Sequence, residues 1–433
     1  MATNSEKENL SSLIASGYSE LTEQSFSQIP VTHWCKHSSG TRQKKQGTRV
    51  CFDPWFHISS LQSVSESELE SALSLQNISL GQKLGAGLGA STIDLTSILS
   101  RAFSQLYKAH RQILGEPHPK IVSQVAKELI EALNSKEVLY RIIVSLTNFE
   151  AASRVYELGE NVLLRPLTEK EFSSFYSDSN YGHRTLPKNA DFCLEFTLSA
   201  EVNPAGPAHE KECKRFQREI DRQLNRILRS LHCCCPGAFS ADTMLIRSAN
   251  LYIGEEYQWG WNAEIRPPKS RPNHEQDLAK FEKFYKSLGQ CLDNARLLAV
   301  DRISDARLRK NPRDKFLDAA TAIEALLLRN QRDGISDTFK NRYSLLFSGS
   351  SQSLKQAEAL YNLRSRLAHG SPDDDVCQAL EQFSDSHQQS EDEEISLEEA
   401  AELAVDMASR VLDLALNDAN FPDSEMDWRQ RER

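Results

Sequence analysis

The sequence has few features of a membrane or secreted protein. Its longest apolar run, at 319–328, is far shorter than a membrane span and contains Thr321 and Glu324. The first residues, MATNSEKENLSS, lack the basic-then-apolar order of a signal peptide. We therefore expect a cytoplasmic protein that has no membrane partner.

The cysteines do not have the pattern of a disulfide framework. They are nine in number, which is odd, their spacing is irregular, and three of them are adjacent, Cys233, Cys234 and Cys235. Such usage fits a reducing compartment. Three neighbouring thiols can be redox-active or bind a metal, but we expect them to act as small hydrophobic residues.

A general excess of positive charge is also missing. The chain has 51 Lys and Arg against 61 Asp and Glu, a net charge of −10. This argues against a surface uniformly adapted to DNA, although a local basic groove is compatible with it. The basic stretch TRQKKQGTR at 41–49 is more typical of a solvated loop than of a nucleic-acid contact.

The length and composition are those of a globular protein with two or three domains. The chain has 433 residues, of which 39% are hydrophobic and 26% charged. We predict an α+β protein with a mixed α/β region followed by an all-α helical bundle. Its expected parts are a loop-rich segment at 1–92, a mixed sensor or regulatory domain at 93–270, a helical domain at 275–419 and a polar tail at 420–433.

Hydrophobic periodicity places the secondary structure. It predicts helices over 93–114, 120–133 and 210–231, and strands over 141–150, 161–167, 192–202 and 243–254. The alternation in 192–202 is typical of a strand that is covered on one face. Further helices are predicted over 275–309, 313–329, 336–347, 353–369 and 397–417, with short connections between the first four. The acidic stretch FSDSHQQSEDEE at 383–394 is expected to separate the last of them.

Three weaker patterns suggest a functional site but also have a purely structural interpretation. A zinc site needs the set His33, Cys35, His37, Cys51 and His57 to converge, and its spacing matches no common zinc motif. The glycine-rich stretch LGAGLGAST at 84–92 lacks the Gly-Lys-Ser/Thr ending of a phosphate loop, so a connector is expected. Trp259 and Trp261 can stack on a base, but such a pair more often packs beneath a sheet.

One predicted helix has an arginine in the middle of its apolar face. On a helical wheel, five residues lie within about 60° of Arg364: Ala357, Leu360, Tyr361, Leu367 and Ala368. A guanidinium cannot lose its charge, so burial without a partner is costly. The helix at 313–329 offers Glu324 within its own apolar arc. A structural ion pair between Arg364 and Glu324 is one interpretation.

His369 closes the same helix. Gly370 follows as the expected left-handed residue after the helix, and Pro372 follows as a stop signal. Arg364 and His369 lie about 140° apart on a regular helix, so one chain hardly directs both at the same atom. A two-fold pairing of this helix can bring two arginines and two histidines into one cleft.

These residues resemble a known superfamily. The segment LYNLRSRLAHG, preceded by FLDAATAIEALLL and ISDTFKNRYSLLF, resembles the Apea-like branch of the HEPN superfamily, a helical bundle that carries an Arg-x4–6-His motif. The likeness covers 275–419. The same spacing occurs at Arg111 to His118 and at Arg226 to His232, but without this context.

The resemblance implies a metal-independent endoribonuclease that acts as a homodimer on RNA and needs no cofactor. RNA carries its own nucleophile, the 2′-hydroxyl, so the enzyme has only to move protons and stabilise charge. His369 is implied as general acid/base and Arg364 as the phosphate clamp. The expected products carry a 2′,3′-cyclic phosphate and a 5′-hydroxyl.

Four further residues are expected to support this site. Glu324 is expected to hold Arg364 in position, and Asn362 and Ser365 to orient either Arg364 or His369. Arg366 faces away from the apolar stripe and is expected to contact the RNA backbone.

Two alternatives remain beside the nuclease. The bundle can be a non-catalytic module for dimerisation or for binding a nucleotide, RNA or a partner protein. The N-terminal part can be a ligand-sensing domain whose output is assembly alone. For the nuclease, the likeness further suggests a toxin-like role in defence against phage, with an activating ligand or a restraining antitoxin.

Overall fold

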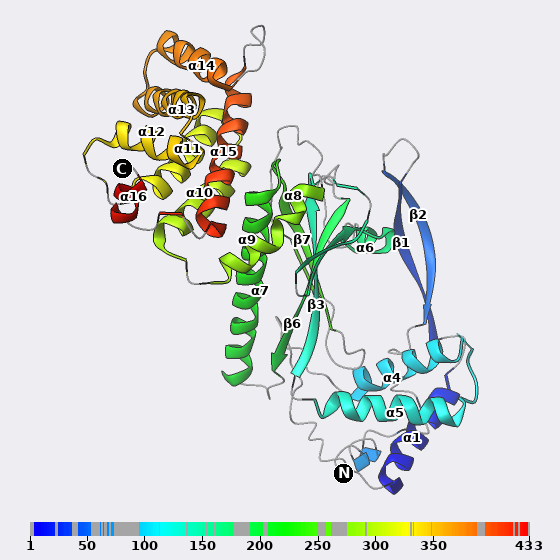
Figure 1. Ribbon diagram of the computed structural model, residues 1–433. Coiled ribbons are helices and arrows are strands. Elements are labelled where there is room, and N and C mark those ends of the chain that lie inside the picture. The colour runs from blue at the N-terminus through cyan, green and yellow to red at the C-terminus, as the bar shows by residue number, and fades with distance from the viewer. Residues whose placement is uncertain are drawn as a thin grey trace.

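The computed structural model confirms an α+β protein. It has a mixed region of helices and antiparallel strands, followed from residue 275 by a region built of helices (Figure 1). The structure describes residues 4–21, 25–36, 42–52, 61, 64, 67–68, 71–72, 95–111, 113–135, 137–149, 151–152, 154–159, 161–175, 191–201, 207–248, 257–260, 275–290, 292–329, 331, 333–347, 349–387, 395–418, 421–422 and 425–431.

A six-stranded antiparallel sheet forms the centre of the mixed region. Its strands are β3 (Glu137–Thr147), β4 (Tyr156–Gly159), β5 (Val162–Pro166), β6 (Phe192–Glu201), β7 (Ser240–Ser248) and β8 (Tyr257–Gly260). Their order across the sheet is β4-β5-β6-β3-β7-β8. Ile142 of β3 lies between Phe196 of β6 and Ile246 of β7, so apolar side chains from three strands meet on one face. The strands predicted at 141–150, 161–167, 192–202 and 243–254 correspond to β3, β5, β6 and β7.

Helices cover both faces of this sheet. The long helix α7 (Pro207–Cys234) packs on one face, where the Phe216 and Tyr140 rings lie 5.1 Å apart. The short helix α6 (Glu169–Phe175) places Phe172 and Phe175 in a second cluster with Cys193 on the other face.

The first half of β6 is therefore buried on both sides, and the prediction of one covered face is wrong there. The polar residue in this stretch, Glu195, remains charged because Arg141 and Arg165 both donate to it. Burial opposes that charge, but the two arginines hold the pKa of Glu195 below its ordinary value.

The N-terminal segment contains regular structure. Helix α1 (Asn4–Ser19) packs against α4 (Leu95–Ala109) and α5 (Pro119–Leu133), and β1 (Phe26–Lys36) pairs with β2 (Arg42–Phe52) as an antiparallel ribbon. The prediction of a loop-rich segment is wrong for these residues. The apolar residues Leu10, Ile14 and Tyr18 recur at helical spacing and are fully buried, which is the signal that the polar composition concealed.

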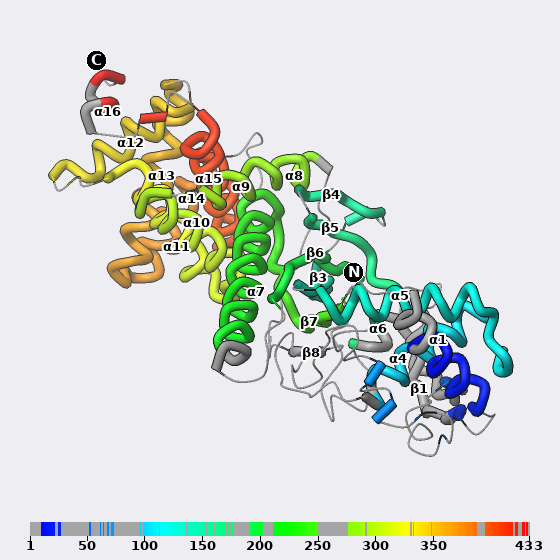
Figure 2. The backbone as a smooth tube through the Cα atoms, turned by 90° about the horizontal axis from the view of Figure 1, so that it is seen from below, coloured from blue at the N-terminus to red at the C-terminus, as the bar shows by residue number. Residues whose placement is uncertain are grey.

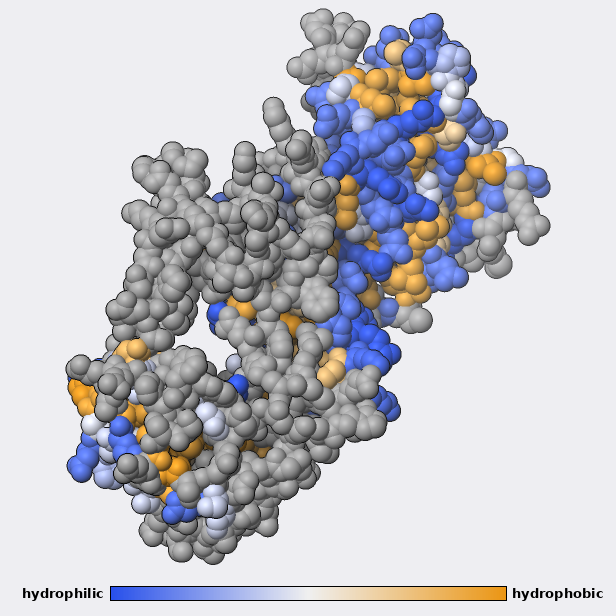
Figure 3. Space-filling view, turned by 180° about the vertical axis from the view of Figure 1, so that it is seen from behind, coloured by the Kyte–Doolittle hydropathy of each residue, from blue (hydrophilic) through white to orange (hydrophobic). Residues whose placement is uncertain are grey.

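From residue 275 onward, the described residues form helices and their connections, and this part is called the helical half below. They are α8 (Glu275–Ala279), α9 (Phe281–Leu288), α10 (Asn294–Leu308), α11 (Pro312–Leu327), α12 (Ile335–Leu346), α13 (Ser351–His369), α14 (Asp373–His387), α15 (Leu397–Asn417) and α16 (Glu425–Arg431). Helix α11 packs most extensively against α10 and α15. On the face in Figure 3, hydrophilic side chains cover much of this half, with apolar patches between them. Within the described part of the chain, no helix has the length and apolar character needed to cross a membrane.

Two predictions about these helices are corrected. The single helix expected at 275–309 is three helices, α8, α9 and α10. Asp293 accounts for the second of the two breaks, because it caps α10 by accepting a hydrogen bond from the Arg296 backbone N–H at 2.9 Å. The start of the acidic stretch at 383–394 belongs to α14, whose first turn holds Asp373, Asp374 and Asp375 directly after Pro372. Residues 388–394 lie outside the described residues.

Helix α7 connects the sheet to the helical half (Figures 1 and 2). Its Arg226 lies over the Tyr285 ring at 3.8 Å and donates to the Tyr285 carbonyl at the end of α9. A Cβ atom at Gly289 would lie 2.1 Å from Arg226 Nη2, so a larger residue there would displace this guanidinium.

His232, near the end of α7, is buried at the same connection. Its Nε2 donates to the Phe239 carbonyl at 2.9 Å, and its Nδ1 accepts from the Ser304 hydroxyl of α10 at 2.8 Å. Burial lowers the pKa of His232 to about 4, in spite of the hydrogen bond to Phe239. The imidazole is therefore neutral in the folded protein.

We expect His232 to make the protein less stable in mild acid. The unfolded chain takes up this proton near pH 6.5, whereas the folded chain takes it up only near pH 4. Between these values the unfolded state binds more protons, so stability falls as the pH falls, by about 2 kcal/mol between pH 7 and pH 5. Urea unfolding of wild type and His232→Gln measures the difference. The exposed His369→Ala variant is the control that keeps the wild-type slope, and equal slopes for wild type and His232→Gln would contradict the expectation.

Candidate functional site

Helix α13 carries the Arg-x4–6-His motif and is regular over its whole length. Ser350 caps its start by accepting from the Ser353 backbone N–H at 3.1 Å. Gly370 ends it in the left-handed conformation, with φ 66° and ψ 41°, and the Ser371 N–H closes back on the Arg366 carbonyl at 3.1 Å. The predicted role of Gly370 is confirmed.

Arg364 forms the predicted ion pair with Glu324. Its Nη2 lies 3.0 Å from Glu324 Oε2, and the two side chains are 29% and 17% exposed. Burial raises the pKa of Glu324, and the attraction of Arg364 offsets this only in part. The Arg364 Nε is buried and has no hydrogen-bond partner within the described residues. The guanidinium is thus anchored at one end and has an unused donor.

His369 lies on the other side of α13. The regular helix separates its direction from that of Arg364 by about 140°. The residue is exposed, and within the described part of the chain it takes part in no hydrogen bond or ion pair. A single chain therefore does not bring Arg364 and His369 together.

A different arginine lies near the end of α13. Arg313, in the first turn of α11, donates to the Leu367 carbonyl. Its Nη2 is 3.8 Å from the position that a Cβ atom on Gly370 would take, so a cation lies beside the turn that follows His369. Sequence reasoning missed Arg313, because 54 residues separate it from Leu367 and no local pattern relates the two.

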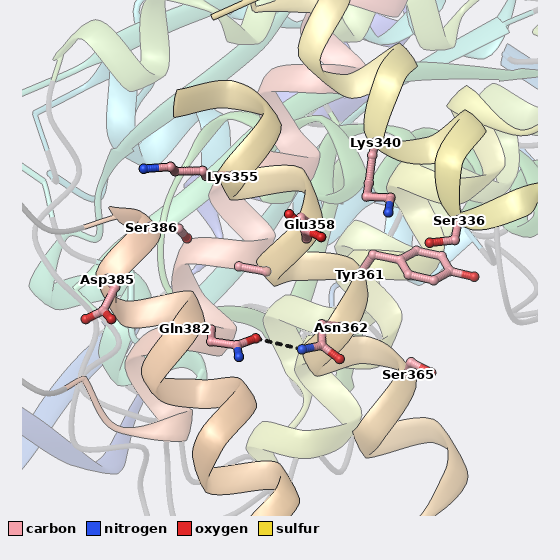
Figure 4. Close-up of a pocket in the computed structure, with 11 residues that line it drawn as sticks. Ser336, Lys340, Lys355, Glu358, Tyr361, Asn362, Ser365, Gln382, Asp385 and Ser386 are labelled. Atoms are coloured by element: carbon pink, nitrogen blue, oxygen red, sulfur yellow. Dashed lines mark hydrogen bonds between the residues drawn. The ribbon is translucent and has the colours of Figure 1, made fainter. Parts of the chain in front are cut away.

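Within the described residues, Asn362 and Ser365 form no hydrogen bond with Arg364 or His369. Both line a polar groove where α12, α13 and α14 meet (Figure 4). Asn362 Nδ2 donates to Gln382 Oε1 of α14 at 2.7 Å. On the helical wheel Asn362 lies about 160° from Arg364, which places the two residues on opposite sides of α13.

The groove has a volume of about 740 Å³. It is lined by Ser336, Lys340, Lys355, Glu358, Ala359, Tyr361, Asn362, Ser365, Gln382, Asp385 and Ser386. Six of these residues belong to α13, and all of them except Tyr361 lie within about 60° of Asn362 on the helical wheel, which is a sequence signal. The residues that α14 contributes to the groove were not predicted, because the sequence analysis did not predict this helix.

Arg366 is exposed, as expected, and lies near the start of α14. Its Nη1 is 3.0 Å from Asp375 Oδ2, and both side chains are about half exposed, at 45% and 44%. Ion pairs this open contribute little to stability. Arg366 can therefore exchange Asp375 for a phosphate at small cost.

The two other Arg-to-His spacings have structural roles. Arg226 and His232 tie α7 to α9 and α10, as described above. His118 caps α5 by accepting from the Lys120 N–H at 3.2 Å, and Arg111 is in a turn with φ 56°. Only the third copy has an exposed histidine that no other residue engages within the described chain.

The adjacent cysteines behave as small hydrophobic residues. All three are buried, and burial raises the pKa of Cys233 to about 12. Among the residues that the structure describes, no three His, Cys, Asp or Glu side chains are grouped to hold a metal ion. His37 and His57 of the zinc pattern lie outside the described residues, as do the glycine-rich stretch at 84–92 and Trp261.

No known protein family, curated protein or solved structure matches the chain. Its function therefore has to be argued from the residues and their geometry.

Proposed function

We propose that the helical half is a HEPN-type endoribonuclease that cuts RNA in the cytoplasm without a metal ion. The observation that carries this proposal is the exposed, unengaged imidazole of His369 at the end of α13. It is on the same helix as Arg364, whose charge Glu324 holds at the edge of the core. A free imidazole and an anchored guanidinium are the two groups that this chemistry needs.

In the proposed reaction the 2′-hydroxyl of one nucleotide attacks the phosphorus that follows it. A base removes the hydroxyl proton, the bond from phosphorus to the 5′-oxygen breaks, and an acid gives that oxygen a proton. His369 serves as general acid/base, and Arg364 stabilises the charge on the phosphorane oxygens. The products are a 2′,3′-cyclic phosphate and a 5′-hydroxyl. DNA has no 2′-hydroxyl and is not cut.

The proposed enzyme works as a homodimer. Because Arg364 and His369 diverge by about 140° on one helix, the arginine and the histidine of a site come from different copies. The mixed α+β half then serves as a sensor that responds to an activating ligand or to an antitoxin. Cutting cellular RNA on such a signal suits defence against phage.

A second function is favoured by a specific observation. Arg364 is already paired with Glu324 and is mostly covered, as a purely structural arginine would be. The alternative is therefore a non-catalytic HEPN-like module for dimerisation or for binding RNA or a nucleotide.

Cleavage of labelled RNA by the purified full-length protein tests the proposal. We expect cutting of single-stranded RNA in EDTA, with 2′,3′-cyclic phosphate ends, and no cutting of DNA of the same sequence. Mass spectrometry of the fragments identifies the ends. A requirement for a divalent metal would contradict the mechanism, and bound but intact RNA would favour the alternative.

A further inference from the structure

The groove and His369 lie on the same side of α13. Lys355, Asn362 and Ser365 line the groove at helical spacing, and His369 follows on the same side of the helix, four residues beyond Ser365. On the wheel His369 is only about 20° from Asn362. The axial distance from Ser365 to His369 is about 6 Å, a little more than one turn, which one nucleotide can span.

The side-chain amides of Asn362 and Gln382 line the groove and together offer a hydrogen-bond donor and an acceptor. Because Asn362 Nδ2 donates to Gln382 Oε1, Asn362 Oδ1 remains as an acceptor and Gln382 Nε2 as a donor (Figure 4). Every nucleobase has a donor and an acceptor side by side on its pairing edge. The half-buried Tyr361 ring lies in the same wall and offers an aromatic surface.

The charged side chains of the groove suit a single nucleotide better than a series of backbone phosphates. Lys355 is exposed and has no partner among the described residues, while Lys340 lies 3.1 Å from Asp337. Glu358 and Asp385 balance these two lysines within the groove. A volume of about 740 Å³ is within the range of small-molecule sites.

We propose that the groove between α12, α13 and α14 binds one unpaired nucleotide of an RNA strand and directs the neighbouring phosphate to His369. This rests on the proposed ribonuclease function. The Asn362–Gln382 edge contacts the base, and Lys355 contacts a phosphate.

Binding of a short fluorescent single-stranded RNA, measured by anisotropy, tests this proposal. The measurements use His369→Ala protein, which leaves the RNA intact. We expect Gln382→Ala to weaken binding about tenfold, as the loss of one base-edge contact would. Lys355→Ala should lower the slope of log affinity against log salt by about 0.7, the value for one phosphate on a single strand. Gln378→Ala, exposed on α14 outside the groove, is the matched control and binds as its parent does.

The outcomes separate this proposal from the proposed function. If wild type cuts RNA, and Gln382→Ala and Lys355→Ala bind and cut as it does, the groove proposal is overturned and the nuclease stands. If wild type does not cut RNA but binds it in a way that both variants weaken, the groove proposal stands and the nuclease fails. If no RNA binds, the groove proposal is overturned.

Discussion

Replacement of His369 by alanine is expected to lower the rate of RNA cleavage by about 10²- to 10⁴-fold, the usual contribution of a general acid or base. The imidazole is exposed and unengaged within the described chain, so its loss removes no contact that stabilises the fold. Affinity for RNA should change little, because proton transfer and not binding is affected. Single-turnover rates and anisotropy measure the two effects separately.

A mixing experiment shows whether the site is shared between copies. Arg364→Ala and His369→Ala are each expected to be inactive. When they are mixed, about half of the dimers contain one of each, and one of the two sites in such a dimer is intact. About a quarter of the wild-type activity should return. Gln378→Ala is the control with full activity. Full activity of His369→Ala would refute the catalytic role, and no recovery on mixing would refute the shared site.

Replacement of Arg307 by methionine is expected to destabilise the protein by about 3 kcal/mol, because it breaks a buried charge network. The Arg307 side chain is 3% exposed; its Nη2 lies 2.9 Å from Asp406 Oδ1, and its Nε donates to the His232 carbonyl at 3.3 Å. Lys315, also 3% exposed, pairs with Glu402 in the same network. These contacts join α7, α10 and α15 between the sheet and the helical half.

The chain offers a matched control for this change. Arg309 is two residues further on and lies 2.8 Å from Asp318, but its side chain is 46% exposed. Arg309→Met should cost less than about 1 kcal/mol, because this guanidinium is half exposed and Arg302 still pairs with the buried Asp318. Urea unfolding of both variants gives the two free energies. Equal losses of unfolding free energy in the two variants would show that burial does not determine how much Arg307 contributes to stability.

Hydrophobic periodicity correctly predicted the helices and strands that have one apolar face. The helix at 397–417 was predicted to the residue, and the pairing of Arg364 with Glu324 followed from two helical wheels. Predictions failed where capping or composition overruled the pattern. Asp293 caps the start of α10 and so divides the helix expected at 275–309. The many polar residues of α14 are typical of a loop, although its Ala379 and Phe383 are buried.

The sequence by itself determined which residues share a face of α13, because 3.6 residues per turn fix those directions whatever surrounds the helix. It thereby separated Arg364 from His369 and assigned the arginine to the core. Only the tertiary structure decided what lies opposite the polar face and the end of this helix. It placed α14 beside Asn362 and Ser365 to form the groove, and it brought Arg313 to the end of α13. The pairing of Arg364 with Glu324 could be inferred because each is a charged residue within an apolar face. The other contacts depend on how whole helices pack, and the local pattern of residues does not determine that packing.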